Sequence, residues 1–138
     1  MQTPSLLRRS GCVLYEVLTV IALWMLASAI ITTIFDNATH GPARWLLQGV
    51  SLLTISGYFL WCWSHGGQTL AMKTWRIRVV ASTGAALTFP QALQRLLFAI
   101  ALLLPAGIGF WWALWDKDGQ FLHDRLAGTR LVLLEKQR

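Results

Sequence analysis

An uninterrupted apolar run, Gly11–Phe35, constrains this chain more than any other feature of its sequence. The run holds one charged side chain, Glu16, among apolar residues and small hydroxyls. An α-helix needs about 20 apolar residues to cross the hydrocarbon layer of a bilayer, and this run supplies them. Two further apolar runs follow, at Trp45–Trp63 and Leu96–Trp115. The pattern predicts an all-α integral membrane fold with spans at about residues 12–35, 45–64 and 96–115.

The composition favours a membrane protein over a soluble domain. The 138 residues, which we expect to form a single domain over 1–138, are 55% hydrophobic and 13% charged. Soluble domains carry about 25% charged residues. Several of the eight tryptophans lie at the ends of apolar runs, where an indole suits the headgroup layer. The net charge of +6 comes from basic residues beside those runs, so the expected partner is a lipid bilayer and not nucleic acid.

The first run also has features of a cleaved signal peptide, because Ala27-Ser28-Ala29 has the small-x-small form of a cleavage site. Against this alternative, apolar sequence continues beyond the motif, and Glu16 would fall inside the apolar region. The breakers in Asp36–Arg44 predict a short turn, so the two flanking helices are expected to be antiparallel neighbours.

The third run leaves two topologies open. It is interrupted at Pro105–Gly109, and such residues break a membrane helix only where protein or water satisfies the backbone. If the run crosses fully, the lysines and arginines divide equally between the two sides. If it bends back, all of them except Arg44 lie on one side. The positive-inside rule favours the broken or re-entrant form, with a cytoplasmic N-terminus.

The polar stretches around the third run predict a small cap containing β-structure, on the cytoplasmic side. The alternation in Arg76–Val80 indicates a strand, Ser82-Thr83-Gly84 a turn, and Ala85–Phe89 a return strand that completes a hairpin. Thr129–Glu135 predicts a final strand, which pairs with Arg76–Val80 if both lie on the same side. Asp116–Gly119 predicts a turn.

The second span carries a polar stripe whose members recur at helical spacing, which places them on one face. Its members are Gln48, Ser51, Tyr58, Cys62 and His65. In hydrocarbon such a stripe faces either another helix or a path for substrate or ions. Cys62 and His65 alone do not make a metal site, so no metal is expected.

Several motifs recur in an order that resembles a known group. Arg9 precedes an acidic residue by seven positions, Gly67-Gln68-Thr69 leads into a short basic strand, and Arg95 lies ahead of the third run. The motif His123-Asp124-x-x-Ala-Gly128-Thr129 follows that run. Together, from about Leu7 to Val132, they resemble the RDD family of small bacterial membrane proteins.

The resemblance implies a polytopic protein of the bacterial inner membrane, for which transport has been suggested, and it does not imply an enzyme. Arg9 matches the arginine that gives the family its name. The family's first aspartate falls on Glu16, which keeps the charge on a longer side chain, and the second is assigned to Asp124. With Arg95, these residues form the candidate charged set.

Glu16 is the sharpest functional candidate, because an ionised carboxylate inside a membrane helix costs several kcal/mol unless it is paired or wet. It could pair with Arg95 or Arg9, reach to the interface, or bind and release a proton or cation. For Asp124 we expect a cap or a pair with Arg125, Arg130 or the Gln68–Thr69 loop. His123 is adjacent in sequence, so the two do not share a helix face.

Two functional classes follow. The protein is either a transport component, cation- or proton-coupled and acting as a homo-oligomer or with another membrane protein, or a scaffold whose charges only lock helices together. Three apolar segments give a monomer little wall for a pore. No nucleophile motif or phosphate loop is present, so no enzymatic activity and no cofactor are expected.

Overall fold

The computed structural model describes residues 3–36, 38–103 and 111–134. Its elements in chain order are α1 (Leu6–Ile34), α2 (Ala43–Ser64), α3 (Leu70–Thr74), β1 (Ile77–Ala81), α4 (Phe89–Leu103), the short 3-10 helix η1 (Trp112–Leu114), α6 (Leu122–Leu126) and β2 (Thr129–Leu133). The described chain is therefore mostly helical, with one small two-stranded sheet.

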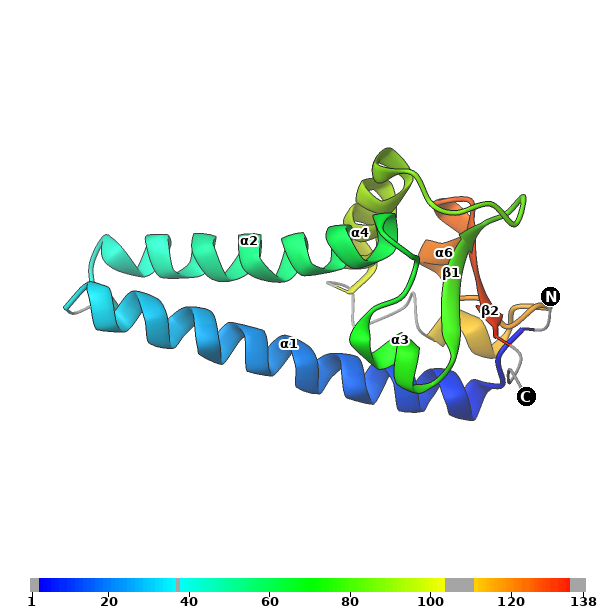
Figure 1. Cartoon of the computed structure of the whole chain (residues 1–138), viewed down its shortest axis with the longest axis horizontal. Helices are drawn as coiled ribbons and strands as arrows, with labels where there is room; N and C mark the ends of the chain where they lie inside the picture. Colours follow the sequence, from blue (N-terminus) through cyan, green and yellow to red (C-terminus); the bar gives the residue numbers. More distant parts are fainter. Residues whose placement is uncertain (1–2, 37, 104–110, 135–138) are drawn as a thin grey trace.

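The two longest helices form an antiparallel pair. Figure 1 shows α1 and α2 side by side, joined by the turn that precedes Ala43, with every other element gathered at the opposite end. Both helices are long and apolar enough to cross a membrane. Their outward side chains, such as Leu53 and Trp61, are exposed, which suits a lipid environment and not the core of a soluble protein. The expected antiparallel turn is confirmed, although Asn37 lies outside the described residues.

The remaining elements, α3, β1, α4, α6 and β2, form a cap at one end of the helix pair (Figure 1). The strands β1 and β2 pair in antiparallel register, with Ile77 opposite Leu133 and Ala81 opposite Thr129. This confirms the predicted pairing of the two strands. Because α4, η1 and α6 come between β1 and β2 in the sequence, the sheet joins two segments that are far apart in the chain.

The predicted β-hairpin is wrong. The turn at Ser82–Gly84 exists, but the chain after it does not return as a strand, and α4 begins at Phe89. The reason is a helix start within the apolar sequence. Gln91 accepts hydrogen bonds through its side-chain oxygen from the backbone N–H of Thr88, at 3.0 Å, and from its hydroxyl, at 3.2 Å. Pro90 also sits in the first helical turn, where its missing N–H costs little.

The third apolar run is also organised differently from a span over 96–115. The helix α4 starts earlier and has 15 residues, roughly 22 Å at 1.5 Å each, which is shorter than the hydrocarbon layer of about 30 Å. Figure 1 shows α4 crossing near the C-terminal end of α2 and not running beside it. The expected break at Pro105–Gly109 lies outside the described residues.

Candidate functional site

Glu16 lies where α1 meets the cap. One carboxylate oxygen, Oε2, accepts a hydrogen bond of 2.6 Å from the hydroxyl of Thr69. The same hydroxyl oxygen accepts from the backbone N–H of Met72 at 3.2 Å, so Thr69 is also the N-cap of α3. The second oxygen of Glu16, Oε1, is buried and has no hydrogen-bond partner among the described residues. Thr69 therefore fixes one carboxylate oxygen of Glu16, and the other oxygen has no hydrogen bond to a described residue.

The motif ahead of Thr69 is built for close packing. Gly67 has a φ of 69°, and a Cβ there would lie 2.4 Å from the carbonyl oxygen of Val79. The Gly67 carbonyl accepts from the N–H of Val79 at 2.8 Å, and the side-chain amide of Gln68 donates to the carbonyl of Ile77 at 2.8 Å. Gly67 and Gln68 thus position β1, and through Thr69 they position Glu16.

Arg95 and Asp124 form a buried ion pair between α4 and α6. The exposed fractions of the two side chains are 3% and 0%. A second bond from Arg95 Nη1 reaches the hydroxyl of Thr129 at 3.0 Å, and that hydroxyl donates to the Asp124 carbonyl at 3.3 Å. The guanidinium lies 4.8 Å from the centre of the Trp63 ring. The cluster ties α2, α4, α6 and β2 together.

The partner predicted for Asp124 was therefore wrong. It pairs neither with Arg125 or Arg130 nor with the Gln68–Thr69 loop, because α6 turns Asp124 into the cap while its neighbour Arg125 points outward. Arg125 forms its ion pair with Asp116 instead. Nε of the guanidinium lies 2.5 Å from one carboxylate oxygen of Asp116, and Nη2 lies 3.0 Å from the other.

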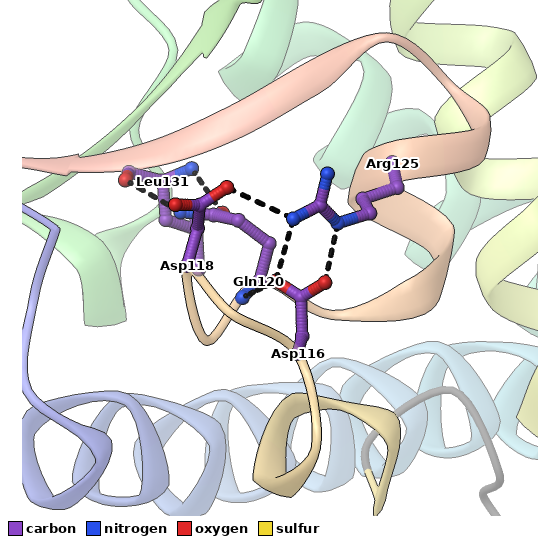
Figure 2. A network of polar contacts seen from close by, with 5 residues as sticks. All are labelled: Asp116, Asp118, Gln120, Arg125 and Leu131. Atoms are coloured by element: carbon purple, nitrogen blue, oxygen red, sulfur yellow. Dashed lines mark hydrogen bonds and ion pairs between the residues drawn. The ribbon is translucent and has the colours of Figure 1, made fainter.

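Figure 2 shows that this network, which runs from the exposed Arg125 to the buried Gln120, also holds the sheet. Asp116 accepts from the N–H of Gln120 at 2.9 Å, and Gln120 bonds both backbone groups of Leu131 in β2. Arg125 also reaches Asp118 at 2.9 Å. The hydrogen bonds from Arg125 lower the pKa of the Asp116 carboxyl. The turn predicted at Asp116–Gly119 is confirmed by a 2.9 Å bond from the N–H of Gly119 to the Asp116 carbonyl.

His123 is buried beside the ion pair. Its Nε2 lies 3.7 Å from Oδ1 of Asp124, and its ring stacks on Phe121 with 5.5 Å between ring centres. Burial lowers the pKa of His123 to about 3, and the positive charge of Arg95 acts in the same direction. The ring is therefore neutral at pH 7. Gly128 has a φ of 63° and ends the α6 turn, so its role is conformational.

Arg9 is 3% exposed near the start of α1. Its Nε donates to the Pro4 carbonyl at 2.9 Å, and its guanidinium lies 5.8 Å from the centre of the Phe121 ring. Its Nη1 is buried without a hydrogen-bond partner in the described part of the chain. Arg9 and Glu16 do not form an ion pair there.

A cavity of about 560 Å³, which we call the cap cavity, joins these residues at the base of the cap. Four polar residues of the candidate set line it: Arg9, Glu16, Arg95 and His123. Most of the remaining wall is apolar and comes from α1, α2 and α4. Such a volume matches sites for small molecules. Asp124 is not among the lining residues but holds Arg95 from behind.

Sequence reasoning therefore found the charged residues but not their neighbours. It missed Trp63, whose ring meets Arg95, and Phe121, whose ring lies between Arg9 and His123. The signal in the sequence that could have identified both residues is their position: Trp63 lies just before the Gly67–Thr69 motif, and Phe121 lies just before His123. The polar residues predicted to form one stripe on α2 do not share one environment. Ser51 is buried, Gln48 is exposed, and the hydroxyl of Tyr58 accepts a hydrogen bond from the N–H of Leu70.

Comparison with known proteins gives three findings. The family model described as "RDD family" matches residues 3–128 of this chain. An uncharacterized protein of Rickettsia prowazekii (strain Madrid E), RP437, is 34% identical over 88 residues, which cover 63% of this chain and 49% of that relative. The chain thus matches about half the length of this curated relative. No solved structure matches the chain.

Proposed function

The chain belongs to the RDD family, and from that membership together with the cap cavity we propose a transport role, with Glu16 as the group that binds and releases a proton or cation. The observation that carries the proposal is the state of this carboxylate. Thr69 holds one oxygen, while the other is free of described partners and belongs to a residue that lines a cavity. A carboxylate with one free oxygen can exchange a proton or a small cation without breaking the fold.

The proposed setting is the bacterial inner membrane, with α1 and α2 as spans and the cap in the cytoplasm. The distribution of charge supports this orientation. Arg44 is the only described lysine or arginine at the turn end of the helix pair, and all the others lie in the cap or the first turns of α1. In this topology α4 enters the membrane without crossing it. A reporter fused after the last residue and another in the Asp36–Arg44 turn test it: the proposal requires opposite sides.

Two spans and one short helix cannot enclose a path, so the proposed transporter is a homo-oligomer or acts with another membrane protein. It is not an enzyme, takes no cofactor and binds no nucleic acid in this proposal. The lipid bilayer is its immediate partner.

Flux through the purified chain in proteoliposomes tests the role of Glu16. A pH-sensitive dye inside the vesicles reports proton movement when a sodium or potassium gradient is imposed. We expect Glu16→Gln to abolish the signal and Glu16→Asp to retain part of it. Asp36→Asn is the matched control, since this exposed carboxylate lies at the far end of α1. Equal flux in the wild type and in Glu16→Gln would end the proposal.

A scaffold without transport is the second candidate, and the Arg95–Asp124 cluster favours it. That ion pair and its bond to Thr129 connect three elements, α4, α6 and β2, and leave no exposed charge in the cluster. A scaffold predicts no flux in the wild type, and loss of abundance in membranes as the first effect of removing any of these charges.

A further inference from the structure

The cap cavity holds two buried arginines with unused donors. Nη1 of Arg9 and Nε of Arg95 have no hydrogen-bond partner among the described residues, and both side chains line the cavity. The two residues are 3% and 2% exposed. Burying a guanidinium N–H without an acceptor costs several kcal/mol, so an acceptor that reaches these side chains from the cavity they both line would stabilise them.

The unmet donors favour an anion as that acceptor. Arg95 is already paired with Asp124, whereas Arg9 donates to a neutral carbonyl, packs on an aromatic ring and feels the charge of Asp116 without a hydrogen bond to it. Glu16 also lines the cavity, but its carboxylate is bonded to Thr69 and not to Arg9. What the described lining lacks is therefore an acceptor for the guanidinium N–H groups, since neither Glu16 nor Asp124 bonds Nη1 of Arg9 or Nε of Arg95. A carboxylate or phosphate offers a guanidinium the acceptors it lacks.

The cavity is elongated, with its polar groups toward one end. The α1 residues that line it run from Arg9 to Val20 at spacings of one helix face, roughly 16 Å along the axis. On the antiparallel α2 the lining runs from Trp63, beside Arg95, to Leu52. The end nearest the cap thus carries the arginines, and the far end is apolar.

The apolar end is open to the outside. Val17, Leu52 and Ile100 line the cavity and are also 49%, 60% and 40% exposed. In a membrane these side chains face lipid, so a ligand can enter sideways from the bilayer with its chain already in an apolar medium.

We propose that the cap cavity binds a single-chain amphiphile whose anionic head, a carboxylate or a phosphate, contacts Arg9 and Arg95 while its aliphatic chain lies between α1 and α2. This site is independent of proton or cation movement at Glu16. The head group could belong to a free fatty acid or to a phosphorylated lipid, and the experiment separates the two.

Binding is measured on the whole chain, purified in a non-ionic detergent, by native mass spectrometry and by the shift in Tm. Four probes share one twelve-carbon chain: dodecanoate, dodecyl phosphate, dodecanol and dodecyltrimethylammonium. Because all four probes carry the same alkyl chain, the contribution of that alkyl chain to partition into detergent micelles is the same for each and cancels when their affinities are compared. We expect one molecule of an anionic probe per chain and a raised Tm, with dodecanol and the ammonium probe weaker by at least tenfold. The tighter anionic probe identifies the head group.

Variants locate the site. Arg9→Gln is expected to weaken the anionic probes about tenfold or more, and Arg8→Gln, the same charge loss at its exposed neighbour, to leave them within about twofold. Val20→Phe fills the apolar end and lowers binding, whereas Leu18→Phe on the exposed face does not. If Arg9→Gln does not fold, Arg9→Lys keeps the charge and retains preference for anions.

Equal binding of all four probes, or equal loss in Arg8→Gln and Arg9→Gln, overturns the proposal, as does the absence of any one-to-one complex. No ion gradient is used, so failure of transport through Glu16 leaves the result unaffected. A chain that binds dodecanoate but moves no protons keeps this site and loses the transport role.

Discussion

Replacing Asp124 by asparagine is expected to destabilise the protein by about 3–5 kcal/mol, because it removes one partner of a buried ion pair and leaves the charge of Arg95 in place. The two side chains are 0% and 3% exposed, so water cannot replace the lost carboxylate. The asparagine has nearly the same shape, and packing changes little.

The matched control lies on the surface of the same cap. Asp118 pairs with Arg125 at 2.9 Å, with exposed fractions of 69% and 44%. An exposed pair contributes about 0–1 kcal/mol, so Asp118→Asn should change stability by no more than that. Both variants lose one negative charge, but the pair at Asp118 is exposed and its arginine keeps Asp116 as a partner.

The assay is unfolding in mixed micelles by titration with an anionic detergent, followed by tryptophan fluorescence. A third variant, Arg95→Met combined with Asp124→Leu, removes both charges of this pair and should recover much of the loss. With the single variants Arg95→Met and Asp124→Leu measured as well, the coupling free energy of this double-mutant cycle is expected to exceed about 2 kcal/mol. Losses below 1 kcal/mol for both single asparagine variants would refute the assignment of a buried pair.

Three more predictions follow from the same contacts. Gly67→Ala is expected to lower the free energy of unfolding by about 2 kcal/mol or more, since the φ of Gly67 is 69° and a β1 carbonyl oxygen lies 2.4 Å from the new Cβ. The control is Gly49→Ala in α2, where nothing lies within 4 Å of the new Cβ. This control variant is expected to stabilise the helix or to leave its stability unchanged. Thr69→Val should cost about 1 kcal/mol through the lost cap of α3, and Thr69→Ser should not; an equal loss in both would mean that the hydroxyl is not what matters. The folded-state pKa of His123, about 3, lies below its unfolded value of about 6.5. Its stabilisation is therefore complete above pH 6.5 and is lost as the pH falls toward 3, with a slope of up to about 1.4 kcal/mol per pH unit. His123→Gln should flatten this acid dependence, as followed by the unfolding midpoint between pH 7 and pH 4.

The local sequence was sufficient for features that depend on neighbouring residues. Two uninterrupted apolar runs of membrane length led to α1 and α2, and the polar Asp36–Arg44 segment led to the turn between them. Alternating residues indicated β1, Thr129–Glu135 was predicted as the final strand, and their pairing was expected if both lay on the same side, which charge counting favoured. A closer reading of Thr88-x-x-Gln91 as a capping box would have replaced the incorrect hairpin by the start of α4.

Only the tertiary structure decided which polar groups meet. The hydroxyl that binds Glu16 comes from a residue 53 positions away, and the partner of Asp124 comes from α4 and not from its own neighbours. A buried carboxylate takes whatever donor the packing of other elements brings to it, and no local pattern records that packing. The sequence therefore determined the two helices of membrane length and the identity of the charges. The crossing of α4 over the end of α2, with the pairing of β1 and β2, decided that those charges meet at one cavity.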